Sequence, residues 1–116
     1  MNIQSEIEFF SDLALVDKAR FLNRLVGEVV EEAKVGAGDG HELRRLRFAQ
    51  EIIQRITRFA YQILSEDAAR PPDDVLIRML LGARADKDAE RIIRNAYRRV
   101  VTGFESFDTT VLLNTQ

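Results

Sequence analysis

The residue best suited to chemistry in this sequence is its one histidine, His41. It lies between the glycine-rich stretch GAGDG at 36–40 and the acid Glu42. An imidazole changes charge near neutral pH, so it can act as a general base, accept a phosphoryl group or bind a metal ion. The chain has no cysteine, which excludes thiolate metal sites, iron–sulfur clusters and cysteine nucleophiles. With a single histidine we can propose neither a Ser-His-Asp grouping nor a transition-metal site.

The segment HELRRL at 41–46 resembles the H-box of histidine kinases and phosphotransfer domains, in which a histidine followed by an acid lies on a helix of a hairpin. The resemblance covers about six residues and implies a phosphotransfer module with His41 as the phosphoacceptor. The chain departs from the pattern in two respects. Glycine and aspartate stand immediately before the histidine, and the kinase proline is replaced by Arg45 and Leu46.

The favoured interpretation of the same segment is an ordinary helix start. Asp39 is expected to be the N-cap, and Glu42 is expected to complete a capping box. His41 then lies in the first helical turn, exposed to solvent. The stretch GAGDG lacks the lysine and the preceding strand of a phosphate-binding loop, so it predicts a helix C-cap followed by a hairpin turn.

A basic stripe near the end of the chain is the second candidate site. It consists of Arg91, Arg94, Arg98 and Arg99. Arginines spaced along one helix face can contact phosphates, which gives the alternative of a nucleic-acid-associated regulator. The favoured interpretation is that they pair with the acidic first helix or cover the edges of the core. The net charge of −2 also argues against a dedicated nucleic-acid binder.

Within the same region, RNAYRRVVTGF at 94–104 resembles the start of the HEPN ribonuclease motif of all-helical bundles. That motif needs four to six residues between the arginine and a histidine. Arg99, Val100 and Val101 are found there instead, so ribonuclease activity is not expected.

Acidic residues in EVVEEAK could present carboxylates to a metal ion, because Glu28 and Glu32 share a helix face. Di-metal bundles also need Glu-x-x-His pairs on facing helices, and the sequence has none. We therefore expect no metal and no cofactor, and we interpret Glu31 and Glu32 as surface residues flanking Lys34.

Apolar residues recur every three to four positions, which predicts helices. The most regular series is Leu46, Ala49, Ile53, Ile56, Ala60 and Ile63, widened by Ile52, Phe59 and Leu64; a second is Ala19, Leu22, Val26, Val29 and Ala33. Two prolines at 71–72 and a weaker break at 82–88 separate two further helices. No sustained alternation indicates a strand.

Several residues are expected to cap these helices. Ser5 with Glu8 fits a capping box, and Ser11 or Asp12 is expected to begin the first long helix. The later helices are expected to begin at Asp73 or Asp74 and at Asp86 or Asp88. Gly36, Gly82 and Gly103 stand where C-caps are expected.

The predicted fold is therefore all-α: a small antiparallel bundle in one domain, 1–116. Long helices at 16–35 and 41–65 form a hairpin, with shorter helices at 73–82 and 87–103, a short N-terminal helix at 5–11 and an irregular apolar segment at 104–116. An up-and-down four-helix topology and a hairpin crossed by two shorter helices are both compatible with this pattern.

The leading functional hypothesis is a non-catalytic interaction or regulatory protein that forms a homodimer. It is supported by the double width of the apolar stripe at 41–65 and by the apolar C-terminal segment. No apolar run approaches the length of a membrane span, and the N-terminus does not have the pattern of a signal peptide. We therefore expect a cytoplasmic protein with a protein partner and no membrane association.

Overall fold

The computed structural model describes residues 3–65 and 71–104. Within this part the chain is all-helical, with helices α1 (Gln4–Ser11), α2 (Leu15–Ala33), α3 (Glu42–Leu64), α4 (Asp73–Leu81) and α5 (Lys87–Gly103). The predicted all-α fold is confirmed, and the helix ends differ from the predicted ones by about one or two residues, which is the usual uncertainty of helix boundaries. Of the apolar C-terminal segment, the part at 105–116 lies outside the described residues.

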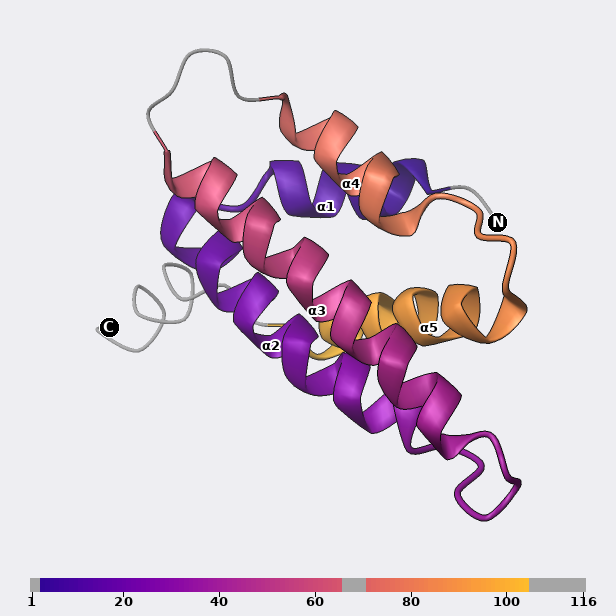
Figure 1. The fold of residues 1–116 in the computed structure, drawn as a ribbon. Coiled ribbons are helices and arrows are strands. Elements are labelled where there is room, and N and C mark those ends of the chain that lie inside the picture. The colour runs from indigo at the N-terminus through magenta and orange to yellow at the C-terminus, as the bar shows by residue number, and fades with distance from the viewer. Residues whose placement is uncertain (1–2, 66–70, 105–116) are drawn as a thin grey trace, which may run out of the picture.

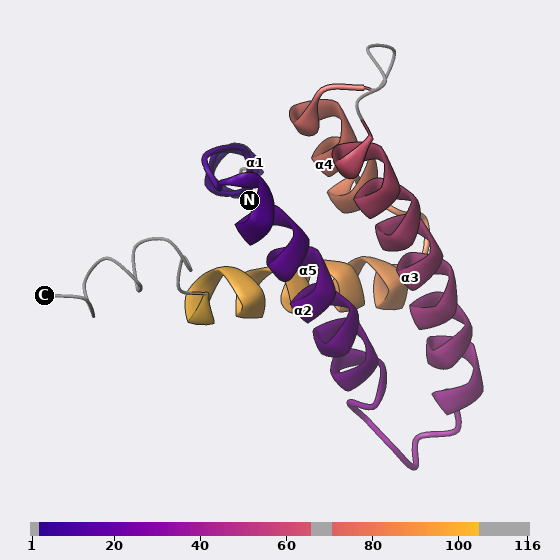
Figure 2. The ribbon, with the colours of Figure 1, turned by 90° about the vertical axis from the view of Figure 1, so that its left-hand side faces the viewer.

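Helices α2 and α3 form the predicted antiparallel hairpin, and the remaining helices cross it. Figures 1 and 2 show α5 running across the hairpin, which it contacts through both α2 and α3. Helices α1 and α4 come from distant parts of the sequence but pack against each other near the open end of the hairpin. Of the two topologies expected, the crossed hairpin is therefore the one observed.

The core lies between the hairpin and the helices that cross it. Aromatic rings form its centre: Phe21 packs edge-on against Phe10 and Tyr97, with ring centroids 5.6 and 4.9 Å apart. The Tyr97 hydroxyl donates a 2.8 Å hydrogen bond to the carbonyl oxygen of Glu6. This bond ties α5 to α1, and burial raises the pKa of the Tyr97 hydroxyl.

Each long helix buries only part of its predicted apolar series. On α3 the buried positions include Ile52, Ile56 and Phe59, whereas the predicted core residue Leu46 is 48% exposed. Ile53 is partly buried and packs against the core. The apolar series in the sequence is therefore the sum of two neighbouring faces, of which only one lies in the core.

Some predicted caps are present and others are not. Asp86 caps α5 by accepting hydrogen bonds from the backbone N–H groups of Asp88 and Ala89. The capping box at Ser5 is wrong, because α1 begins after Ile3 and no side chain caps it. The start at Ser11 or Asp12 is also wrong, since α2 follows Ala14 without a side-chain cap. In both helices, packing against the core fixes an N-terminus that has no side-chain cap.

Of the three glycines predicted as C-caps, one has that role and two do not. Gly82 is the C-cap of α4, as predicted. Lys34 takes that role in α2, while Gly36 lies two residues further on with a positive φ of 83°. Gly103 is the last residue of α5, and Phe104 follows as its cap. Among the described residues no helix is both long and apolar enough to cross a membrane.

Candidate functional site

His41 is exposed and immediately precedes the first residue of α3. Its backbone N–H donates a 2.9 Å hydrogen bond to Asp39 Oδ1. Asp39 is thus not the N-cap that the sequence predicted, because the helix begins later and His41 takes that position. The carboxylate of Glu42 instead accepts a hydrogen bond from the backbone of Gly38. The histidine therefore belongs to the hairpin turn and not to the face of a helix.

The turn at His41 is held by an arginine that the sequence did not single out. Arg45 is only 3% exposed. It donates to both carboxylate oxygens of Asp39, at 2.7 and 2.9 Å, and to the carbonyl oxygens of Ala33 and Gly36. The bonds from Arg45 and from the backbone of His41 lower the pKa of Asp39 to about 2. A buried arginine with one carboxylate and two carbonyl acceptors fixes the turn, which is a structural role.

The predicted arginine stripe on α5 is largely engaged within the molecule. Arg91 and Arg99 both reach Glu32 on α2, with N···O distances of 3.1 and 2.9 Å, and Arg99 also lies 3.6 Å from Glu28. Arg94 is partly buried, and its Nε is buried without a hydrogen-bond partner. Arg98 is exposed. For Arg91 and Arg99 this agrees with the interpretation that the arginines pair with the acidic first long helix.

The interpretation of Glu32 as a surface residue is wrong. Glu32 was expected at the surface beside Lys34, but only 2% of it is exposed. The expectation failed because α5 crosses α2 at this point and brings two guanidinium groups to the carboxylate. Glu31, by contrast, is exposed and forms the expected pair with Lys34 at 3.6 Å.

The side of the hairpin away from α5 has an unusual surface, which we call the uncovered face. It combines two rows of residues at alternating spacings of three and four. On α2 the row is Val16, Ala19, Asn23, Val26 and Val30; on α3 it is Leu43, Leu46, Gln50, Ile53, Thr57, Ala60 and Leu64, with Tyr61 beside it. No member of either row is charged, although 31% of the chain is.

Several apolar members of this face are strongly exposed, whereas Val26, Ile53 and Ala60 are partly buried against the core. Tyr61, Leu64 and Leu43 are 75%, 58% and 67% exposed. Near the open end of the hairpin, this face contains a groove of about 300 Å³ between α2 and α3. The small side chains of Ala19 and Ala60 line this groove. Exposed apolar side chains gathered on one face in this way commonly mark a contact with another molecule.

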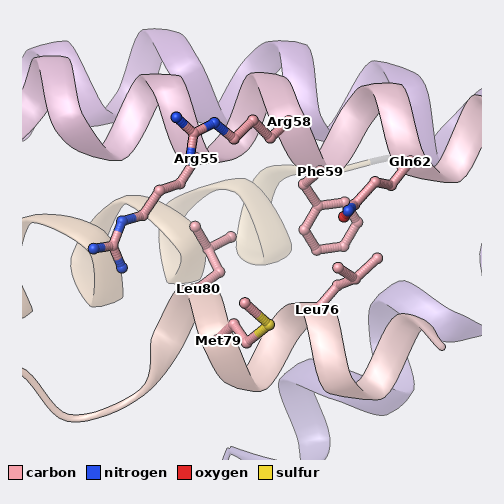
Figure 3. A pocket seen from close by; sticks show the side chains of 7 residues that line it. All are labelled: Arg55, Arg58, Phe59, Gln62, Leu76, Met79 and Leu80. Atoms are coloured by element: carbon pink, nitrogen blue, oxygen red, sulfur yellow. The ribbon is translucent and has the colours of Figure 1, made fainter. Parts of the chain in front are cut away.

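A second groove, of about 430 Å³, lies between α3 and α4 and is shown in Figure 3. Its apolar walls come from both helices, with Phe59 and Leu76 facing each other across it. The remaining lining residues are Arg55, Arg58, Gln62, Met79 and Leu80. This groove thus combines an apolar floor with a cationic rim. We call it the α3–α4 groove.

In the described ranges no group of three or more histidine, aspartate or glutamate side chains is placed to hold a metal ion. No protein-family model, no curated protein and no solved structure matches this chain.

Sequence reasoning identified the excess apolar width of α3 but missed both the α3–α4 groove and Arg45. The position of α4 against α3 decides whether a groove exists, and no local pattern reports that position. For Arg45 the sequence did contain a signal, which is its spacing from the apolar residues of the same helix. Arg45 lies seven and eleven residues before Ile52 and Ile56, on the same side of α3, so the helical period places it toward the core.

Proposed function

We propose that this chain is a non-catalytic interaction protein that forms a homodimer through the uncovered face of the α2–α3 hairpin. The observation that carries the proposal is the absence of charge from two adjacent helical rows in a chain rich in charged residues. Solvent-facing helix surfaces are normally charged or polar, so an uncharged one is best explained by a protein neighbour.

A second copy of the chain is the occupant that this surface fits best. A two-fold contact sets the same patch against itself, so any charge near its axis meets its own copy. A face without charge avoids that repulsion. Alternating spacings of three and four residues on two antiparallel helices also suit packing as a four-helix arrangement built from two hairpins.

The proposal is tested by the mass of the particle in solution. We expect light scattering at micromolar concentration to give twice the 13.3 kDa of the chain. Tyr61→Glu, on the uncovered face, should shift the particle to the monomer, because a carboxylate would be buried against its own copy. Met79→Glu is the matched control: Met79 is 65% exposed but lies on the α3–α4 groove.

Loss of the dimer in Tyr61→Glu alone, with unchanged helicity by circular dichroism, would support the proposal. A wild-type chain that stays monomeric up to 100 µM, or a dimer that Tyr61→Glu leaves intact, would contradict it.

The two alternative functions have separate tests. A phosphotransfer module would form an acid-labile phosphate on His41 when given a labile donor such as acetyl phosphate, and His41→Ala would abolish it. A nucleic-acid-associated regulator using the stripe of Arg91, Arg94 and Arg98 would bind DNA or RNA with an affinity that falls as salt rises. We expect neither result, because His41 lies in the hairpin turn and Arg91 and Arg99 are paired with Glu32.

A further inference from the structure

The α3–α4 groove has the chemistry of a docking site. Phe59, Leu76 and Leu80 form its buried floor, at 3%, 5% and 3% exposure. Met79 stands beside them and is 65% exposed. An exposed methionine next to a buried apolar floor is typical of surfaces that adapt to a partner's apolar side chains, because the thioether chain repacks easily.

The opposite rim of the groove, on α3, is positively charged. Arg55 and Arg58 line it, and Figure 3 shows both on the α3 side. Arg55 forms an ion pair with Glu51 at 3.0 Å. Arg58 is exposed, and no acidic side chain among the described residues forms an ion pair with it. The groove therefore has an apolar floor contributed by both helices and a cationic rim on the α3 side.

A third arginine lies close to the same rim. Arg84 Nη2 donates to the carbonyl oxygen of Leu80, a lining residue, while Arg84 Nε is buried without a hydrogen-bond partner. Burial lowers the pKa of Arg84, and the positive charge of Arg55 lowers it further, although Glu51 and Glu90 act in the opposite direction. The guanidinium groups thus repel each other, and a carboxylate brought to this rim would relieve that repulsion.

From this arrangement we propose that the α3–α4 groove binds an acidic amphipathic helix of a partner protein. Its apolar side chains would lie over Phe59 and Met79, and its carboxylates would lie beside Arg55 and Arg58. The lining residues of α3 span 55–62, or about 10 Å at 1.5 Å per residue, which matches about two turns of a docked helix.

The shape of the groove favours a helix over a small amphiphilic anion. A pocket for a small ligand encloses most of the ligand surface. This groove is elongated between two helices and about half open to solvent, and Met79, at 65% exposure, stands at its solvent edge. It also lies on the other flank of α3 from Tyr61 and Leu64, so the proposal is independent of self-association through the uncovered face.

The test uses a fluorescein-labelled 15-residue peptide with leucines at i, i+3, i+4 and i+7, glutamates flanking them and alanine elsewhere. A peptide of the same composition, scrambled so that the leucines share no face, is its control. We expect saturable polarisation with the first peptide, weakening as NaCl is raised from 50 to 500 mM, and at least about tenfold weaker binding of the scrambled peptide.

Arg58→Glu should weaken binding of the amphipathic peptide about tenfold, because it replaces attraction by repulsion at the rim. Arg47→Glu is the matched control on the same helix, since Arg47 is also exposed and lies about three turns away; it should change affinity less than about twofold. Tyr61→Glu, which addresses the uncovered face, should leave peptide binding unchanged.

Three results would overturn the proposal. The first is no binding of the amphipathic peptide to wild type at 1 mM. The second is equal weakening by Arg47→Glu and Arg58→Glu. The third is binding of sodium decanoate, tested as a small amphiphilic anion, at a site that excludes the peptide and with higher affinity than the peptide.

Discussion

The two sides of the α2–α3 hairpin reverse the usual distribution of charge. The side facing the other helices contains buried charged residues, among them Glu32 at 2% exposure, which sits between Arg91 and Arg99. The opposite side, exposed to solvent, has two rows of residues without any charge. Buried charges are tolerated only when they are paired, and on the covered side the pairing groups come from the same chain. The uncovered face lacks the charged side chains that are usual on a solvent-exposed surface, and we propose that a second copy of the chain covers it.

The largest effect is expected when one side chain is shortened on each side of α3. Ile56→Ala, on the covered side, should lower the free energy of unfolding by about 2–5 kcal/mol because it leaves a cavity in the core. Leu46→Ala, on the uncovered face, should cost less than about 1 kcal/mol in the monomer. Urea denaturation below micromolar concentration, where self-association contributes least, measures both.

Similar losses in Ile56→Ala and Leu46→Ala would show that the two sides of α3 do not differ. If Leu46→Ala lowers the free energy of unfolding by an amount that grows with protein concentration, Leu46 lies in the dimer contact.

The second test concerns the buried carboxylate on the covered side. Glu32→Gln keeps the size of the side chain but removes the charge that Arg91 and Arg99 share, so we expect a loss of about 1.5–3 kcal/mol of unfolding free energy. Glu31→Gln is the matched control on the exposed face of α2, and it should change stability by less than about 0.5 kcal/mol. Equal effects in the two variants would mean that the buried ion pairs do not stabilise the crossing of α5 over α2.

A smaller, pH-dependent effect is expected at the hairpin turn. The bonds from Arg45 and from the backbone of His41 lower the pKa of Asp39 from 3.8 to about 2 in the folded chain. Its ionised form therefore stabilises the fold at pH values above about 4, and that contribution is lost as the pH falls from about 4 to about 2.

Asp39→Asn should accordingly be less stable than wild type between pH 5 and 7, and the difference should shrink as the pH approaches 2. Thermal unfolding across this range measures it. A difference between the two proteins that stays constant with pH would contradict the assigned role of the Asp39 carboxylate.

The sequence predicted the helices better than their rotation about their own axes. Apolar spacing and breaks gave all five helices of the described part, because these signals are local. The same spacing did not reveal which face is buried: the series through Leu46 and Ile53 lies between the core face and the uncovered face. An apolar stripe that serves two contacts has its centre between them, so its period alone cannot distinguish the core from an interface.

The candidate surfaces depended on features that no local pattern contains. Burial of Glu32 follows from α5 crossing α2, and the α3–α4 groove follows from α4 packing beside α3. Both depend on contacts between residues far apart in the sequence. The width of the α3 stripe is the sequence feature from which the homodimer is proposed.

The most direct test of the central claim is whether the uncovered face becomes protected when the chain associates. The chain has no cysteine, so Thr57→Cys introduces a single thiol in the exposed row of α3, and Ala83→Cys introduces one in the exposed connection after α4. Alkylation rates are measured from 0.1 to 100 µM protein. The homodimer predicts that the thiol at position 57 reacts at least about tenfold more slowly at the highest concentration, while the thiol at position 83 does not change. Equal rates at both positions at every concentration would contradict it.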